Sequence, residues 1–203
     1  MNDNFTGQLV NGVLPNQTTP ANPDVYTDNV QNKTSAISGP QGLYQNTNAP
    51  WIFTFLKYFA GAVTVAPLAG PVVTGPMSGC YLCQYTQGGN EYLAHIGTLN
   101  DSDSQETIDA KNDWLNFVAN VTEVSGGRPD DYFSTTEMQQ AMVNQQEPKI
   151  LSYFDGAAAY AILAIQLPKS LIPTGLTLLR VAMVKEMTLQ PWATLSALRA
   201  FKV

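Results

Sequence analysis

After residue 50, the chain alternates short apolar runs with glycine and proline. The runs Trp51–Leu56 and Ala62–Ala66 are aromatic or β-branched and are bounded in this way, which predicts two strands. Three later runs predict further strands, although the alanine-rich middle one also fits a helix. They cover Ile150–Phe154, Ala157–Leu167 and Leu176–Met187.

A β-hairpin is predicted around Gly88-Gly89-Asn90. The two apolar runs Cys80–Gln87 and Glu91–Thr98 flank this segment. Glycine enters the positive-φ positions of tight turns at little steric cost, so the segment fits a short hairpin loop.

A first helix is predicted over residues 103–122. Asp103 and Glu106 have the spacing of a capping box, in which each side chain binds a backbone N–H of the other residue. Apolar residues then recur at helical spacing and form one stripe that would be buried: Ile108, Trp114, Leu115, Phe117, Val118 and Val121. The segment Ser-Gly-Gly-Arg-Pro at 125–129 is expected to end this helix.

A second short helix is predicted from Ser134 to about Asn144, with Glu137 completing another capping box. Pro191 fits the first turn of a final amphipathic helix, whose apolar residues are Trp192, Leu195, Leu198 and Phe201. Strands, then helices, then strands indicate an α+β fold: a mostly antiparallel β-sheet or sandwich with two to three flanking helices.

Residues 1–50 differ in texture from the rest of the chain. They contain nine Asn, five Pro and a single basic residue, Lys33, and they have no helical or strand period. This composition predicts a loop segment or an arm that lies on the core. Residues 51–203 are expected to form one α+β domain, because they suffice for a single hydrophobic core and argue against two.

Charge and hydropathy exclude several classes of protein. Sixteen acidic against ten basic residues give a net charge of −6, which is the wrong sign for binding phosphate backbones, so we expect no nucleic-acid partner. The longest apolar run, 58–73, is interrupted by Pro67 and Pro71, so no membrane span is expected. The first seven residues lack basic and apolar regions, so we expect no Sec-type signal peptide.

The only histidine, His95, follows Cys80 by fifteen residues across the predicted hairpin. A two-residue loop would place Leu82 opposite His95 and Cys80 diagonal to it on the same face, roughly 7–8 Å away at the backbone. A three-residue loop would instead place Cys83 opposite His95. The length of the turn therefore decides which sulfur lies near the imidazole.

Cys80 has the better setting for nucleophilic chemistry. The segment 74–79 is expected to be a constrained loop, in which Ser78 and Gly79 allow close approach of a substrate and free backbone N–H groups could bind an oxyanion. An adjacent imidazole is expected to lower the pKa of the Cys80 thiol. Cys83 points to the other face and is expected to be a small core residue.

Other chemistries fit these residues less well, and an ordinary buried Cys and His remain possible. A Cys-x-x-Cys redox motif favours a helix N-terminus rather than a strand. Structural zinc needs four ligands, and two Cys with one His leave one missing, so no metal is expected. Ser78 paired with His95 lacks the Gly-x-Ser-x-Gly spacing of a nucleophile elbow.

The segment around Cys80 resembles the glutamine deamidase toxins typified by cytotoxic necrotizing factor and the Burkholderia lethal factor, with the chemotaxis receptor deamidases as more distant relatives. The shared pattern is a Thr six residues before a nucleophilic Cys, a Ser-Gly-Cys element and a His on the following strand. Here these are Thr74, Ser78-Gly79-Cys80 and His95. Met77-Ser78-Gly79-Cys80 is similar to the Leu-Ser-Gly-Cys element of the lethal factor, and the resemblance covers residues 74–98.

The resemblance implies a hydrolase, a protein-glutamine deamidase that converts a Gln side chain of a target protein to Glu and acts as a bacterial toxin or virulence effector. Cys80 would be the nucleophile and His95 the acid and base, and Thr74 would support the dyad by hydrogen bonding. The backbone at Ser78 and Gly79 would form the oxyanion loop, and the Cys80 N–H would stabilise the oxyanion. No cofactor is implied. The protein would be secreted or delivered into a host cell without a Sec-type signal, and otherwise cytoplasmic.

Two alternatives stay open. A Cys protease or transglutaminase would use the same dyad and differ in the bond broken or in the acceptor. A non-catalytic binding or structural module would instead make its contacts through the Asn-rich segment and the sheet surface.

Overall fold

The computed structural model describes residues 9–11, 30–36, 50–56, 58–99, 103–142, 148–166 and 178–197. The strands are β1 (Leu9–Asn11), β2 (Val30–Ala36), β3 (Pro50–Leu56), β4 (Val63–Pro67), β5 (Val72–Met77), β6 (Tyr81–Gln87), β7 (Asn90–Ile96), β8 (Thr122–Gly127), β9 (Lys149–Phe154), β10 (Ala159–Gln166), β11 (Leu178–Met187) and β12 (Gln190–Pro191). The helices are α2 (Gln105–Val118), the 3₁₀ helix η1 (Pro129–Tyr132), α3 (Thr135–Ala141) and α4 (Trp192–Ala197).

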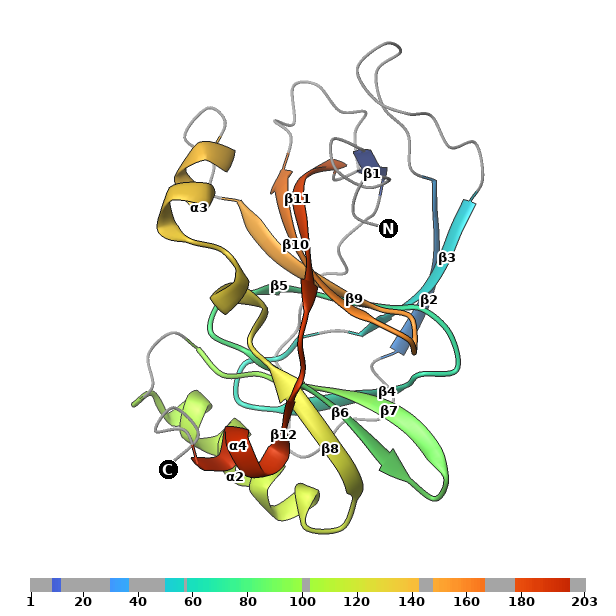
Figure 1. Cartoon of the computed structure of the whole chain (residues 1–203), viewed down its shortest axis with the longest axis vertical. Coiled ribbons are helices and arrows are strands. Elements are labelled where there is room, and N and C mark those ends of the chain that lie inside the picture. Colours follow the sequence, from blue (N-terminus) through green and yellow to red (C-terminus); the bar gives the residue numbers. More distant parts are fainter. Residues whose placement is uncertain are drawn as a thin grey trace.

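The strands form two sheets. Sheet A has the order β1-β11-β10-β9-β5-β3-β2, and sheet B has the order β12-β8-β6-β7-β4. Neighbouring strands are antiparallel except for the parallel pair β3 and β5. Sheet A and α3 occupy the upper part of Figure 1, and sheet B with α2 and α4 occupies the lower part. The predicted α+β fold with mostly antiparallel sheets is therefore confirmed.

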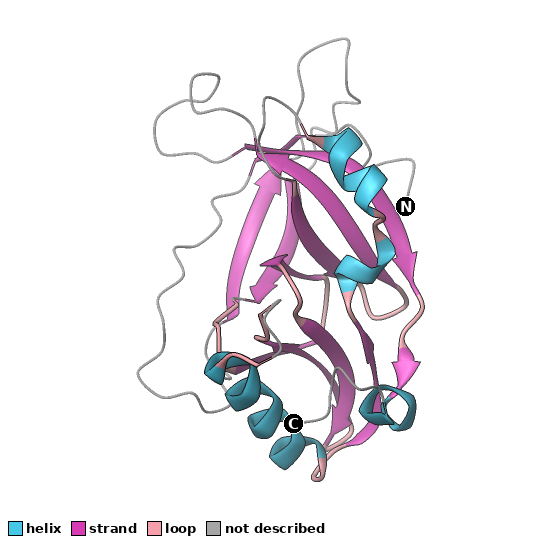
Figure 2. Cartoon of the chain, turned by 90° about the vertical axis from the view of Figure 1, so that its left-hand side faces the viewer, coloured by secondary structure: helices cyan, strands magenta, loops and turns pink. Residues whose placement is uncertain are grey.

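Two of the hydrophobic clusters lie on the two faces of sheet B, and a third is formed by residues of sheet A. Leu82 and Leu93 of sheet B pack in one cluster with Ile150 and Phe154 of sheet A. The alternate residues of β6 and β7 point to the opposite face and pack with Trp114 of α2, which runs along the outside of sheet B (Figure 2). Successive residues of a strand face opposite sides, so one hairpin supplies both layers.

The hairpin between β6 and β7 has the shorter of the two possible loops. Gln87 pairs with Asn90, and Leu82 pairs with His95. Gly88 and Gly89 form the turn with φ of 60° and 80°, a conformation that only glycine adopts without strain. The predicted hairpin is confirmed, and the register is the one that places Cys80 rather than Cys83 on the face of His95.

Helix α2 begins and ends differently from the prediction. Ser104, not Asp103, caps it, and its hydroxyl accepts a hydrogen bond from the backbone N–H of Thr107. The Thr107 hydroxyl in turn accepts a hydrogen bond from the backbone N–H of Leu99, so the helix start is tied to the end of the hairpin. The predicted stripe holds for Trp114 and Val118, which are buried, but Leu115 is exposed.

The helix ends at Val118, and the segment after it is a strand rather than the expected turn. Strand β8 pairs with β6, with Gly126 opposite Cys83. A Cβ atom at Gly126 would lie 2.3 Å from the carbonyl oxygen of Leu82. Glycine at position 126 permits the close approach of two strands. In the sequence, such a glycine cannot be distinguished from one that marks a turn.

Part of the N-terminal region belongs to sheet A. Strand β1 pairs with β11, and β2 pairs with β3. The prediction of a loop or arm is therefore wrong for these two segments, and the rest of residues 1–49 lies outside the described residues. The sequence did not reveal them because β2 is mostly polar and β1 has only three residues. A strand can draw its stability from backbone pairing along a sheet edge rather than from an apolar pattern.

Helix α3 has the capping box predicted for it. The Ser134 hydroxyl accepts a hydrogen bond from the Glu137 N–H, and the Glu137 carboxylate accepts one from the Ser134 N–H. Glu137 also forms an ion pair with Lys185 of β11, at 2.6 Å. The helix ends at Ala141, and Met142 is already extended, so the predicted end at about Asn144 is wrong. Leu198 and Phe201 after α4 fall outside the described residues.

Replacing Ser134 by alanine should lower the free energy of unfolding by about 1 kcal/mol, because it removes the acceptor for the Glu137 N–H at the helix start. Urea denaturation measures this change. Thr136→Ala is the control, because Thr136 is an exposed residue in the first turn of the same helix. An equal loss in both variants would contradict the capping role.

Candidate active site

Thr74 and His95 meet between the two sheets, and Cys80 lies on the same sheet face as His95 without a hydrogen bond to it. Thr74 lies in β5, an interior strand of sheet A between β9 and β3, His95 lies in β7 of sheet B, and Cys80 immediately precedes β6. All three side chains are buried. The expectation that 74–79 is a loop is wrong for its first four residues, because β5 continues to Met77 and pairs with β3 and β9.

A hydrogen bond from Thr74 fixes the protonation of the imidazole. The Thr74 hydroxyl donates its single proton to the Leu56 carbonyl oxygen at 2.8 Å. Its oxygen lies 2.6 Å from His95 Nδ1 and therefore accepts the Nδ1–H. The neutral imidazole thus carries its proton on Nδ1, and Nε2 has a free lone pair.

The second ring nitrogen of His95 is unusual. Nε2 is buried and has no hydrogen-bond partner among the described residues. Most buried polar atoms are paired, and exceptions concentrate at functional positions. The ring of Tyr58 lies 5.3 Å from the imidazole, measured between ring centroids.

Thr98 holds Cys80 through two hydrogen bonds. The Cys80 thiol donates to the Thr98 carbonyl oxygen at 3.1 Å, and the Thr98 hydroxyl donates to the Gly79 carbonyl oxygen at 2.6 Å. The Gly79 carbonyl and the Cys80 N–H belong to one planar peptide unit and point in opposite directions. The Thr98 hydroxyl therefore fixes the direction of the Cys80 N–H, the predicted oxyanion donor.

Burial determines the ionisation of both groups. It raises the pKa of the Cys80 thiol to about 12, and it lowers the pKa of His95 to about 3. The expectation that the imidazole lowers the pKa of the thiol is therefore wrong for this state of the protein. At neutral pH, both the Cys80 thiol and the His95 imidazole are therefore neutral, and they do not form an ion pair.

The lowered pKa of His95 predicts acid destabilisation. The folded-state pKa of His95 lies below the unfolded value near 6.5, so the neutral imidazole contributes to the free energy of unfolding. This contribution is fully present above pH 6.5 and is lost as the pH falls toward 3. The free energy of unfolding should fall by up to about 1.4 kcal/mol per pH unit in this window.

Urea denaturation between pH 7 and pH 5 measures this slope. His95 is the only histidine, and His95→Asn replaces the Nδ1–H with an amide N–H that does not titrate. The variant should lose most of the slope above pH 5.5, where few carboxylates titrate. An unchanged slope in the variant would contradict a buried neutral imidazole.

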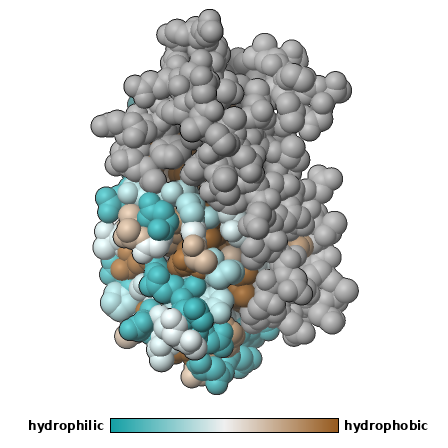
Figure 3. All heavy atoms as spheres, turned by 90° about the vertical axis from the view of Figure 1, so that its right-hand side faces the viewer, coloured by the Kyte–Doolittle hydropathy of each residue, from teal (hydrophilic) through white to brown (hydrophobic). Residues whose placement is uncertain are grey.

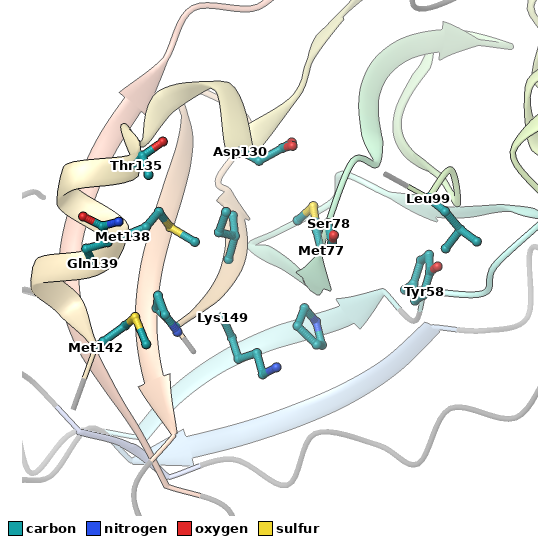
Figure 4. A pocket seen from close by; sticks show the side chains of 13 residues that line it. Tyr58, Met77, Ser78, Leu99, Asp130, Thr135, Met138, Gln139, Met142 and Lys149 are labelled. Carbon is teal, nitrogen blue, oxygen red and sulfur yellow. The ribbon is translucent and has the colours of Figure 1, made fainter. Parts of the chain in front are cut away.

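A cavity of about 570 Å³ lies beside the dyad. Tyr58, Ser78 and Leu99 line it, and these three residues are in contact with, or close in sequence to, His95, Cys80 and Thr98. Figure 4 shows Tyr58 and Leu99 at one end of the cavity and Met138 and Met142 at the other. Cys80 and His95 themselves do not line the cavity, and other residues separate them from it.

The other predicted residues lie where the alternation of the strand places them. Cys83 is fully buried on the opposite face of sheet B, with Trp114 and Tyr85, as predicted for a core residue. Ser78 is exposed and lines the cavity. Gly79 has a φ of 83°, which a residue with a side chain rarely adopts.

Sequence reasoning missed Thr98, Tyr58 and Asp130. Thr98 was within reach, because continuing the hairpin register two residues beyond Tyr81 and Ile96 places it opposite Gly79. Tyr58 and Asp130 come from other parts of the chain, and no local pattern connects them to Cys80.

Other features of the described residues bear on binding. No group of three or more His, Cys, Asp or Glu side chains within them is placed to hold a metal ion. None of the helices in this part of the chain has the length and hydropathy needed to cross a membrane. Among the described residues on the face shown in Figure 3, hydrophobic residues form small groups interrupted by hydrophilic ones.

Comparisons with protein-family models, curated proteins and solved structures find no match.

Proposed function

We propose that this protein is a cysteine-dependent amidohydrolase that deamidates a glutamine side chain of a target protein. The observation that carries the proposal is the unpartnered Nε2 of a neutral imidazole, oriented by Thr74, on the same sheet face as the Cys80 thiol. Nucleophilic acyl transfer requires a base with a free lone pair that can reach the thiol, and the hairpin register that puts both residues on one face supports this pairing. The Thr74, Ser78-Gly79-Cys80 and His95 pattern of the deamidase toxins supports the same assignment.

The reaction proceeds through a thioester. The Cys80 thiol gives its proton to His95 Nε2 as the sulfur attacks the carboxamide carbon of the substrate. The carbon–nitrogen bond then breaks, and Nε2 returns the proton so that ammonia leaves. Water attacks the thioester with Nε2 as base, which releases a glutamate side chain and restores the thiol. Thr74 acts as a positioning residue, and the Cys80 N–H stabilises the oxyanion.

In this proposal, the substrate reaches Cys80 from the cavity, past the residues that separate the two. The substrate carboxamide enters from the side of Tyr58, Ser78 and Leu99, and the Tyr58 ring moves away from His95. Proton transfer between the neutral thiol and the neutral imidazole then accompanies attack, so a preformed thiolate is not needed. The protein partner is the one that carries the reactive Gln, and the resemblance to toxins favours an effector that is delivered into a host cell.

One observation favours a second function, that of a non-catalytic binding or structural module. Cys80 and His95 are each 1% exposed, and the thiol donates to Thr98 rather than to His95. In such a module, Thr74 and His95 would only connect the two sheets. It predicts a Cys80 thiol that does not react with iodoacetamide in the folded protein at neutral pH.

The test is to incubate the protein with a blocked glutamine dipeptide, benzyloxycarbonyl-Gln-Gly, and to follow ammonia and product mass. A deamidase releases ammonia and adds one dalton to the dipeptide. Cleavage of the peptide bond would indicate a protease, and attachment of an added amine would indicate a transglutaminase. No ammonia together with an inert Cys80 thiol would overturn the proposal in favour of the non-catalytic module.

A further inference from the structure

Asp130 borders the cavity and has one buried carboxylate oxygen, Oδ1, without a hydrogen-bond partner among the described residues. Its other oxygen, Oδ2, lies 2.7 Å from Arg128 Nη2 in an ion pair. Leaving a buried acceptor unpaired costs stability, so the free oxygen calls for an explanation.

Asp130 lies close to the proposed nucleophile. Its charge contributes to raising the pKa of Cys80, after the larger effect of burial. In Figure 4, Asp130 and Ser78 lie between the methionine end of the cavity and the end formed by Tyr58 and Leu99. A group that enters the cavity to reach Cys80 therefore comes near Asp130.

The surrounding contacts hold the Asp130 carboxylate in place. Asp130 belongs to the short helix η1, and its carbonyl oxygen accepts a hydrogen bond from the Phe133 N–H at 3.2 Å. Arg128, which binds Oδ2, lies over the Tyr81 ring at 5.5 Å, and Tyr81 directly follows Cys80. The Arg128 guanidinium group therefore connects the Asp130 carboxylate to Tyr81, the first residue of β6 and the neighbour of Cys80.

We propose that Asp130 Oδ1 accepts a hydrogen bond from the carboxamide N–H of the substrate and makes the site specific for a primary amide. This inference rests on the proposed function. A carboxylate accepts hydrogen bonds but donates none, so it binds the –NH₂ of glutamine and repels a carboxylate. The glutamate product is repelled for the same reason, which favours its release.

Two neutral alkylating reagents test the proposal at Cys80 without the natural target. Iodoacetamide has amide N–H groups to donate, whereas iodoacetonitrile has none and is smaller, so a preference for the amide cannot come from steric exclusion. Labelling of the Cys80 peptide is followed by mass spectrometry, and the ratio of the two rates is divided by the same ratio for free cysteine. We expect an enrichment of about tenfold for the amide, the value of one hydrogen bond to a charged group.

Variants of Asp130 and Asp131 test whether the Asp130 carboxylate causes the enrichment. Asp130→Asn and Asp130→Ser should return the enrichment close to one. Asp131→Asn should keep it, because Asp131 also lies within 4.0 Å of Arg128 but its side chain is 66% exposed. An enrichment near one in the wild-type protein, or one that Asp130→Asn leaves intact, would overturn the role of Asp130 alone. Failure of both reagents to label Cys80 in the folded protein would overturn the proposed function together with this inference.

Discussion

Replacing Cys80 by alanine should reduce ammonia release from the glutamine dipeptide by a factor on the order of 10⁴ or more. The variant lacks the atom that forms the thioester, and no other cysteine lies on the same face of the hairpin. Cys80→Ser keeps a hydroxyl of similar size, but it should also lose most activity, because a hydroxyl is a far weaker nucleophile than a thiol without further activation. Initial rates of ammonia formation measure both effects.

Cys83→Ala is the matched control for this experiment. Cys83 lies three residues further along the chain, in β6, but it packs on the side of α2 and makes no contribution to the proposed chemistry. The variant should keep the wild-type rate if it is folded, which thermal unfolding of all three variants establishes. A folded Cys80→Ala protein that still releases ammonia at the wild-type rate would rule out the thioester mechanism.

Replacing Gly97 by alanine should lower the free energy of unfolding by about 4 kcal/mol or more. A Cβ atom at this position would lie 1.9 Å from the Phe59 carbonyl oxygen and 2.9 Å from that of Ala62. Both are backbone atoms, so they cannot move aside as a flexible side chain would. The clash also breaks the backbone hydrogen bonds that connect Gly97 to Gly61 and Ala62, each 2.9 Å long.

The control for this prediction is Gly70→Ala. A Cβ atom at Gly70 would have no heavy atom within 4 Å, so its stability should stay within about 0.5 kcal/mol of the wild type. Urea denaturation of the two variants measures the difference. Equal stabilities would mean that the segment after His95 packs less closely against residues 59–62 than the structure has it.

The hairpin could be predicted in detail because it depends on local rules. Two glycines determine the turn, and the turn determines the register, so the positions of Cys80 and Cys83 relative to His95 follow from counting residues. The capping box at Ser134 was predictable for the same reason, since its partners are three residues apart. These features need no knowledge of the rest of the chain.

The burial of the site could not be predicted, because it arises where two sheets pack. Whether an imidazole next to a thiol raises or lowers the pKa of that thiol depends on how much water remains around the two groups. That depends on residues such as Leu56 and Tyr58, which are far from Cys80 in the sequence. Gly126 could not be interpreted from the sequence for the same reason, because the atoms that leave no room for a side chain at this position belong to a neighbouring strand.

The hydrogen bond between Thr74 and His95 joins one sheet to the other. The imidazole is therefore carried by one layer of the molecule and oriented by the opposite layer. A slide of the two layers past each other would rotate the ring and withdraw its free nitrogen from the sulfur, with every strand still intact. The proposed activity would then depend on the alignment of the two sheets, and it would be lost on heating before the chain unfolds.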